Sequence, residues 1–594
     1  MLLSRAALAA ALSASTPAAA LQDAAPTRWY DVRAALAASA EAPPLVDLRT
    51  HLTSAAIDAL APPRTNLALG PYYAVDDGDF VIAVRAAAQA EGAALEAVRT
   101  EAGFVGVTGD AAAQRAAAAA VDAMSAALLE GVAVEVLRVD DATLPTGVAP
   151  VLDPDAADAL ALQLERAAVT RGVALLGRPV GLGDVEVRTF LYDYDVEVAS
   201  GAVAADPVVS AVRPGMEVAV QVDRAADGRR FVVRALGRDG SLAVPMRTVE
   251  IDGLGGATIE LPRVATSLWA VSGLVEPGGA LVIDHDGGGS SALVVRIAPE
   301  GAAPSPTSVL PLGELALRPM RPEPVRTEVA RPSGGWGGDR EEVAEATAPW
   351  TDGSVPVSVL DEALEPAMEA AGAVRFGSVL LLPVPDAVAP GVRSAVESLA
   401  ADASIGTVGV EVRYGTLSAA GVRALRAPGG VAAFASSAGP RLMGSALEGD
   451  ALLLVGGEES AYLQDHDSQI AGGSTIPDPI VAHTFEGIAL WCSPLRAPGG
   501  ALTAWFDVQA HEPAPEPRAV DAVQYGPNAH RGSGSQPIAA GTFRRDLAIE
   551  LPTTRRVHAR TSVRATEGEW ALVALRPVPG ADATLVVAAR MTAR

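Results

Sequence analysis

The sequence contains no lysine, so all 45 of its basic residues are arginine. Schiff-base catalysis, Ser-Lys dyads and Walker-type phosphate-binding loops each need an ammonium group, and the sequence therefore excludes them. With 71 acidic residues, the formal net charge is −26. A field of this sign disfavours phosphate backbones and anionic lipid surfaces, so we expect no nucleic acid partner.

Cysteine and aromatic residues are also scarce. The single cysteine, Cys492, cannot form a disulfide within the chain. It ends an apolar run that begins at Ile488 and includes Trp491, which predicts a buried, inert thiol. Only 4% of residues are aromatic while 49% are apolar. We therefore expect cores of Ala, Val and Leu in short strands and small helices rather than a large ligand cavity, and we identify no small-molecule substrate.

Long hydrophobic runs are absent as well. No later stretch reaches the ~18 uninterrupted apolar residues of a spanning helix, so we expect no helical membrane anchor. The N-terminus has one arginine, an apolar run from Ala6 to Ala14, and small residues at Ala18 and Ala20. This is the pattern of a cleavable secretory signal, and we predict cleavage after Ala20 and export of the mature chain.

The main positive feature is an internal repeat. The segment LYDYDVEVASGAVAADPVVSAVRPGMEVAVQVDRAADG, from Leu191, aligns without a gap with LQDHDSQIAGGSTIPDPIVAHTFEGIALWCSPLRAPGG, from Leu463, at an offset of 272 residues. Gap-free agreement of this density predicts a duplicated β unit. The matched residues include Asp193 with Asp465, Asp195 with Asp467, Gly201 with Gly473, Asp206-Pro207 with Asp478-Pro479, Gly215 with Gly487, and Gly228 with Gly500.

The repeat extends in both directions. Residues 259–262 match 549–552 downstream, and residues 134–136 match 410–412 upstream. Each copy is preceded by a short strand and an amphipathic helix. In the first, residues 104–108 precede a helix with Asp110 as its cap, Val121, Met124 and Leu128 on one face, and Gly131 as its stop. In the second, residues 379–382 precede a helix with Val392, Val396 and Leu399 on one face.

Asp465-His466-Asp467 is the most obvious candidate metal site, because carboxylate and imidazole are common zinc and manganese ligands. On a strand, however, the central histidine points away from the face that the two aspartates share. The aligned residue of the first copy is Tyr194, whereas both aspartates are matched. We therefore expect this pair of carboxylates to bond backbone N–H groups or cap a turn.

Other motifs have equally plain interpretations. We expect Asp284-His285-Asp286, before three glycines, to form a polar turn. Ser437 has the spacing of a nucleophile elbow but lacks the first glycine and a following helix. GLGD at 181 and GLGG at 253 lack the context of a dinucleotide site. We assign no catalytic residue, no cofactor-binding or metal-binding residue, and no cofactor.

The order of these motifs resembles the bacterial secretin family, the outer-membrane channel proteins of type II and type III secretion and of type IV pilus machines. The "VEV" runs are similar to the strand that opens the secretin homology domain. SAGPRL at 437–442 is similar to its turn, and LVEPGGALVI at 274–283 to its closing strand. The small α/β parts resemble secretin ring-building domains. The resemblance covers most of residues 95–300 and 370–590.

The resemblance implies an α+β fold: a tandem repeat of a small α/β ring-building-like domain followed by a β-rich secretin-like domain. The boundaries we expect are a signal peptide at 1–20, an N-terminal α/β region at 21–132, a first β-rich domain at 133–300, a Pro/Gly-rich linker at 301–350, a second small α/β domain at 351–407 and a second β-rich domain at 408–594.

We accordingly expect an exported, non-enzymatic cell-envelope protein, periplasmic or outer-membrane-associated, that is a structural or assembly component of a protein secretion or pilus-type system. Its expected partners are envelope or secretion-system proteins, including its own copies through β edges. Lipid-facing strands with aromatic girdles are not evident in the sequence, so we expect no pore of its own. The alternatives are a metal-dependent hydrolase using an Asp-His-Asp site and an extracellular binding module with exposed β edges.

Overall fold

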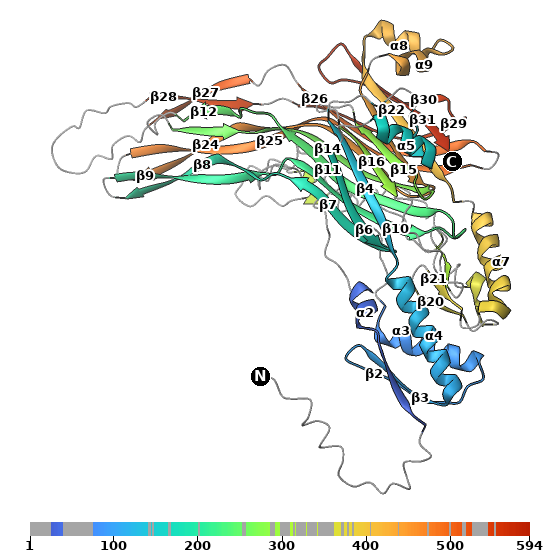
Figure 1. The fold of residues 1–594 in the computed structure, drawn as a ribbon. Helices are drawn as coiled ribbons and strands as arrows, with labels where there is room; N and C mark the ends of the chain where they lie inside the picture. The colour runs from blue at the N-terminus through green and yellow to red at the C-terminus, as the bar shows by residue number, and fades with distance from the viewer. Residues whose placement is uncertain are drawn as a thin grey trace.

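The structure is a computed structural model, and it is rich in β-strands with a smaller number of helices (Figure 1). It describes residues 25–39, 75–140, 148–163, 168–199, 202–251, 257–285, 291–297, 385–403, 405–437, 439–471, 474–497, 500–513, 518–525, 544–551 and 554–594, together with Leu144 and short stretches between 309 and 382. The predicted signal at 1–20 lies outside these residues.

A small α/β unit begins the described chain. Its three strands pair in the order β1-β3-β2, and its core includes Phe80, Val107 and Val121. Asp110 caps α4 by accepting a hydrogen bond from the backbone N–H of Ala113, as predicted. The elements are β1 (Thr27–Asp31), α2 (Arg33–Ser39), α3 (Asp77–Ala90), β2 (Leu95–Glu101), β3 (Phe104–Gly109) and α4 (Ala111–Leu128).

The predicted helix stop at Gly131 is wrong. Helix α4 ends at Leu128, with Leu129 as its C-cap. Gly131 is instead the first residue of the next strand, where it lies opposite Leu175. Pairing with that neighbouring strand begins directly at Gly131, so the glycine belongs to a sheet and not to a helix cap.

A second small unit has the same strand arrangement. Its strands pair in the order β17-β21-β20, and α7 places Val392 and Val396 in a core with Leu310 and Leu380. The predicted amphipathic helix with Val392 and Val396 on its buried face is therefore confirmed. The elements are β17 (Val309–Pro311), β20 (Val374–Phe376), β21 (Val379–Leu381) and α7 (Pro385–Ala403).

Both β-rich parts contribute strands to the same two sheets. Sheet 1 has the order β29-β26-β25-β24-β14-β11-β10-β7, with every neighbouring pair antiparallel. Its strands are β7 (Arg178–Val185), β10 (Gly215–Arg224), β11 (Phe231–Leu242), β14 (Arg263–Val275), β24 (Leu452–Ala471), β25 (Ser474–Arg496), β26 (Leu502–Pro513) and β29 (Thr554–Ala565).

Sheet 2 has the order β30-β31-β22-β23-β15-β16-β4-β6, and β5 also pairs with β15. Its strands are β4 (Gly131–Asp140), β5 (Val151–Leu152), β6 (Ala168–Leu175), β15 (Ala280–His285), β16 (Ser291–Ile297), β22 (Thr407–Leu417), β23 (Arg441–Leu447), β30 (Trp570–Pro577) and β31 (Thr584–Ala593). Helices α5 (Pro154–Gln163), α8 (Ala419–Leu425) and α9 (Gly430–Ser436) lie beside it (Figure 1).

The two sheets share one hydrophobic core. Alternate residues of β10, namely Val218, Val220 and Val222, belong to the same buried cluster as Val410 and Val412 of β22. This period of two is what a strand requires when one face is buried. Complete burial of one such valine contributes about 1.5–3 kcal/mol relative to leaving it exposed. The core therefore joins the first β-rich part to the second.

Four further hairpins complete the described structure. They are β8 (Arg188–Ala199) with β9 (Ala202–Val212), β12 (Arg247–Glu250) with β13 (Thr258–Leu261), β18 (Glu328–Val329) with β19 (Glu341–Glu342), and β27 (Arg518–Tyr525) with β28 (Arg544–Leu551). In Figure 1 three of them, β8–β9, β12–β13 and β27–β28, reach to the left beside β24 and β25, while the small α/β units lie below the sheets.

The aligned segments form hairpins with the same register. Leu191 lies opposite Val209, and after a register shift Asp193 lies opposite Val208. At the aligned positions, Leu463 lies opposite Val481 and Asp465 opposite Ile480, with the shift at the same place. The two hairpins differ in whether each arm is one strand or two. In the first part the arms are divided into β7 and β8, and into β9 and β10, whereas β24 and β25 are unbroken.

A hairpin turn lies at residues 226–228, where Ala-Asp-Gly separates two apolar runs, as Asp-Gly commonly does in hairpins. Strands β10 and β11 pair on either side of it, and Gly228 has a φ of 67°. The Asp227 carboxylate accepts hydrogen bonds from the backbone N–H groups of Arg229 and Arg230, at 2.8 and 2.9 Å. In the second part Gly500 has a φ of 83° in the turn between β25 and β26.

Candidate functional site

Asp465-His466-Asp467 lies on β24, as the prediction of a strand required. Its backbone is paired with β25, and His466 lies opposite Pro479. At the aligned place in the first part, Tyr194 donates its hydroxyl to the Thr258 carbonyl at 3.4 Å. Within the described residues, no group of three or more His, Cys, Asp or Glu side chains is arranged to hold a metal ion.

The predicted polar turn at Asp284-His285 is wrong. Both residues continue β15, where Asp284 lies opposite Met443 and His285 opposite Leu442 of β23. The Asp284 carboxylate is 6% exposed and forms an ion pair with Arg441. The strand continues past Ile283 because β23, far away in the sequence, provides both a pairing partner and a counter-charge. Asp286 lies outside the described residues.

The other motifs considered as candidate sites lie at the following places in the structure. Ser437 follows α9 as its C-cap and donates its hydroxyl to the Phe434 carbonyl, so a helix precedes it where an elbow would need a strand. Cys492 is buried on β25, as predicted, and burial raises the pKa of its thiol, which disfavours the reactive thiolate. GLGD at 181 lies within β7, and GLGG at 253 falls outside the described residues.

The two β-rich parts meet at a junction that includes strand pairs in both sheets. In sheet 1, β14 pairs with β24 from Arg263 opposite Ser460 to Ala270 opposite Leu453. In sheet 2, β15 pairs with β23 beside the Asp284–Arg441 ion pair. The junction is therefore built twice, once in each sheet, by pairing a strand of one part with a strand of the other.

A buried polar network holds this junction. Asp450, 2% exposed, accepts hydrogen bonds from Arg234 at 3.0 Å and from the Ser272 hydroxyl at 2.8 Å. The Ser272 hydroxyl accepts from the Leu447 N–H at 2.9 Å, and the Ser445 hydroxyl donates to the Ser272 carbonyl at 2.9 Å. Because a buried carboxylate needs these partners, the network fixes the relative positions of the strands that supply them.

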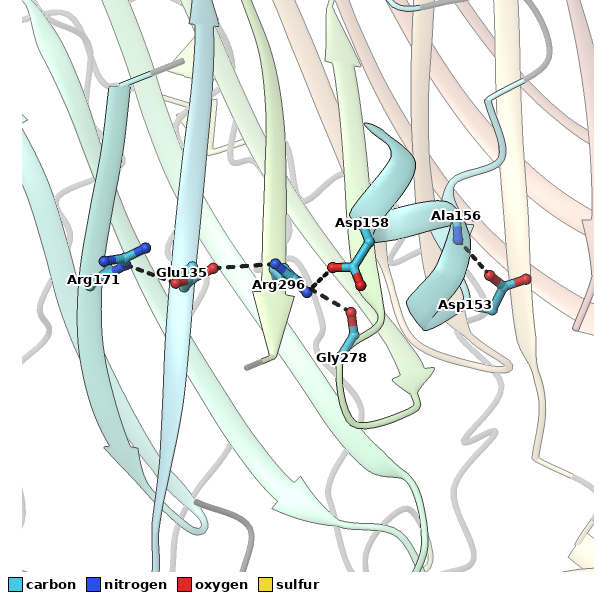
Figure 2. A network of polar contacts seen from close by, with 7 residues as sticks. All are labelled: Glu135, Asp153, Ala156, Asp158, Arg171, Gly278 and Arg296. Carbon is cyan, nitrogen blue, oxygen red and sulfur yellow. Dashed lines mark hydrogen bonds and ion pairs between the residues drawn. The ribbon is translucent and has the colours of Figure 1, made fainter. Parts of the chain in front are cut away.

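A second polar network lies across sheet 2 (Figure 2). Glu135 of β4 contacts Arg171 of β6 at 2.7 Å and Arg296 of β16 at 3.7 Å. Arg296 also pairs with Asp158 of α5 and donates to the Gly278 carbonyl at 3.3 Å. Figure 2 shows these groups in one row that ties the helix to three strands.

The second β-rich part contains a corresponding ion pair. Glu411 of β22 pairs with Arg590 of β31. Glu135 and Glu411 are the central residues of the matched "VEV" runs, which the sequence identified as strands without assigning a role to the glutamate. The sequence does contain a clue to these ion pairs. In both parts a glutamate lies at the centre of an apolar strand, where a buried charge needs a partner.

Each sheet ends in two edges that differ in chemistry. In the described part of the chain, β7 and β6 have one pairing partner each at one side of the molecule, and β29 and β30 at the other. The β29 sequence TRRVHARTSVRA has four arginines and no acidic residue. Near the β7 edge lie Asp184 and Glu186.

One acidic residue next to the β29 edge is already paired. Asp507 of β26 accepts from His558 at 2.7 Å and from Arg560 at 2.8 Å, both on β29. Burial would raise the pKa of Asp507, but the hydrogen bonds from His558 and Arg560 outweigh it and lower the pKa below its ordinary value. On the same strand, Arg555 lies opposite Glu512 of β26, and Arg564 lies opposite Thr503.

No helix in the described part of the chain is both long enough and apolar enough to cross a membrane.

No family model and no curated protein matches this chain. Among solved structures it is similar to the secretin InvG of the Salmonella SPI-1 type III secretion injectisome, at 12% identity and a TM-score of 0.20, over 40% of this chain and 78% of that one. It is similar to the type II secretin GspD of enteropathogenic Escherichia coli at 12% identity and a TM-score of 0.17, over 40% and 83% of the two chains. ExeD of Aeromonas hydrophila matches at 9% identity and a TM-score of 0.17, over 90% and 91%. These similar structures are secretins.

Proposed function

We propose that this chain is an exported, non-enzymatic structural component of the cell envelope, built from two secretin-like modules in tandem. It would serve a protein secretion or pilus-type system without forming a pore of its own. Module 1 denotes residues 133–300 and module 2 residues 408–594.

The observation that supports this proposal best is the strand order. In sheet 1, β7-β10-β11-β14 of module 1 are followed by β24-β25-β26-β29 of module 2. In sheet 2, β6-β4-β16-β15 are followed by β23-β22-β31-β30. Corresponding strands thus occur in the same order in both modules and in both sheets. A motif repeated side by side within continuous sheets is an arrangement for building an extended framework.

The use of charge supports the same function. Asp450, Asp284, Glu135 and Glu411 all form ion pairs or hydrogen bonds with arginines from other strands. Carboxylates engaged in this way tie neighbouring strands to one another, whereas a general acid or base must be free to exchange its proton during each turnover.

Cell fractionation tests the proposal. The mature chain should begin after Ala20, occur in the envelope fraction, and be recovered with secretion or pilus components after cross-linking in cells. Deletion of the gene should reduce secretion or piliation. An uncleaved chain in the cytoplasm, or unchanged secretion and piliation, would contradict the proposal.

Two measurements on the purified mature chain test its narrower parts. Dye-loaded vesicles should retain their dye when the chain is added. Release of the dye would show that the chain forms a pore. Metal analysis should find less than stoichiometric zinc or manganese. A stoichiometric metal that is lost in His466→Ala would favour the metal-dependent hydrolase instead.

A further inference from the structure

We propose that Glu458 and Glu486 form a pH-sensitive clamp at the base of the outer hairpin, which holds β24 and β25 together best when the two carboxyl groups share one proton. The outer hairpin comprises residues 461–471 of β24 and 474–483 of β25. Ionisation of both carboxyl groups loosens its base. The inference concerns a conformational property of this hairpin and is independent of the proposed function.

The two glutamates lie where the outer hairpin leaves the body of sheet 1. Strand β14 pairs with β24 as far as Ser460, and β26 pairs with β25 from Gly487 onward. Beyond these residues the described ladder joins β24 and β25 to each other (Figure 1). Glu458 lies directly opposite Glu486 at this boundary. A change in how these two side chains interact therefore acts at the point where the outer hairpin begins.

The two carboxylates share a single guanidinium. Side chains directly opposite each other on antiparallel strands have Cβ atoms about 4.5–5.5 Å apart. The Glu458 carboxylate forms an ion pair with Arg263 of β14 and accepts a hydrogen bond from the Ser460 hydroxyl at 3.2 Å. No ion pair joins Glu486 to another residue in the part of the chain that the structure describes. The pair therefore carries one negative charge more than its arginine neutralises.

The next strand adds a third carboxylate to the row. His511 of β26 lies opposite Gly487, so continuing the register places Glu512 level with Glu486. Glu512 in turn lies opposite Arg555 of β29. Each outer glutamate of the row thus has an arginine on the strand beyond it, whereas Glu486, in the middle, has a glutamate on both sides. Like charges directly opposite each other on neighbouring strands destabilise their pairing.

The strands that pack on the outer hairpin carry further charged residues. Ala461 and Val481 alternate with the two glutamates along their strands, so their cluster with β8, β12 and β13 lies on the opposite face, as does His483 opposite Ala461. Glu260 accepts from the Leu191 N–H there, and Arg441 of the neighbouring β23 pairs with Asp284. The charged residues of these strands, and of β28 beside β24, are Arg188, Asp193, Asp195 and Glu197 of β8, Arg247 and Glu250 of β12, Glu260 of β13, Arg441 of β23, and Arg544, Arg545, Asp546 and Glu550 of β28.

The sign of the pH effect follows from the surroundings of Glu486. Burial first and the Glu458 charge second raise the pKa of Glu486, and Arg263 opposes them in part. In the unfolded chain a glutamate has a pKa of about 4.3. The stability that a raised pKa contributes is complete below that unfolded value and is lost as the pH rises through the folded value. Protonated Glu486 donates its O–H to the Glu458 carboxylate and removes one negative charge. Acid therefore tightens the base of the outer hairpin, and neutral pH loosens it.

Module 1 provides an internal comparison. At the 272-residue offset, Glu458 corresponds to Glu186 and Glu486 to Pro214. The backbones meet there too, since the Glu186 N–H donates to the Pro214 carbonyl at 3.0 Å, but the second carboxylate is missing. Both arms of that hairpin are interrupted at this place, between β7 and β8 and between β9 and β10. The carboxylate pair thus occurs in the module whose strands run unbroken into the outer hairpin.

Hydrogen exchange in the full mature chain tests the inference. Glutamine has the shape of protonated Glu486 but does not ionise, so Glu486→Gln should keep the base closed at every pH. At pH 7.5 we expect the amides of the outer hairpin to exchange about three- to fivefold more slowly in Glu486→Gln than in wild type, since one repulsive cross-strand pair is lost. At pH 4.5 the two proteins should agree within about 1.5-fold, because Glu486 is then mostly protonated. Both proteins contain His483, so its titration cancels in the ratio of their exchange rates.

Two further variants separate the clamp from a general effect of charge. Glu186→Gln is the matched control, because Glu186 holds the corresponding place in module 1 without an opposing carboxylate, and it should leave exchange in the outer hairpin unchanged at both pH values. Arg263→Gln removes the cation and should speed exchange at pH 7.5 more than at pH 4.5. A ratio of wild type to Glu486→Gln that is the same at both pH values would overturn the inference, and so would an equal effect of Glu186→Gln.

Discussion

At the scale of single residues, two glycines occupy matched crossing points. Gly215 and Gly487 have φ values of 114° and 155°. A Cβ at Gly215 would collide with the carbonyl oxygen of Asp184, and one at Gly487 with that of Gly456. Asp184 and Gly456 are themselves related by the 272-residue offset. The same backbone approach therefore occurs in both modules and permits only glycine.

We predict that Gly487→Ala costs at least about 3 kcal/mol of unfolding free energy, since strain in φ adds to a collision with backbone that cannot move aside. Gly500→Ala is the matched control: its φ of 83° is also positive, but a Cβ there would meet nothing within 4 Å. The control should cost only about 1 kcal/mol. Urea unfolding measures both, and equal losses would contradict the steric argument.

A partly buried histidine, His483, predicts a pH dependence of stability. Burial lowers the pKa of His483 to about 4. The unfolded chain, with a histidine pKa of about 6.5, binds this proton more readily. The free energy of unfolding is therefore not reduced by His483 above pH 6.5. It falls by roughly 2–3 kcal/mol as the pH is lowered from 6.5 towards 4. In His483→Gln the decline between pH 6.5 and 4 should be smaller by that amount, and identical slopes for both proteins would refute it.

At the scale of elements, the junction strands depend on Asp450. We predict that Asp450→Asn costs about 3–5 kcal/mol, because Arg234, 2% exposed, would be left as a buried charge without its counter-ion. Asp227→Asn is the control, since Asp227 pairs with Arg230 in a half-exposed turn and should cost about 1 kcal/mol or less. Equal effects in thermal unfolding would show that the network does not hold the junction.

Elements with local signals could be predicted from the sequence. The Asp110 cap, the alternation of Val218, Val220 and Val222, and the turn at Gly228 each depend on residues within a few positions of one another. The gap-free offset likewise indicated hairpins whose register and bulge agree.

The junction could not be predicted in this way. Ser272 and Asp450 are 178 residues apart, and Asp284 and Arg441 are similarly distant, so nothing beside any of them in the sequence indicates the partner. The three glycines that follow Asp284-His285-Asp286 therefore predict a turn at Asp284, where the structure has a strand. The β14–β24 and β15–β23 pairs are likewise decided by how the two modules fit together.

At the scale of the whole molecule, one core and two continuous sheets join the modules. We therefore predict a single cooperative thermal transition for the β-rich parts. Limited trypsin digestion should cut after arginines in the linker predicted at 301–350, and the two fragments should still elute together in gel filtration. Two separate transitions, or fragments that elute apart, would show that the modules fold independently.

The internal junction also affects how readily the two modules meet. Every β14–β24 contact is made as the chain folds, at the high effective concentration of two segments of one polypeptide. Two modules made as separate chains would have to meet by collision, at a rate set by their concentration. Completion of the two continuous sheets in this chain is therefore independent of protein concentration.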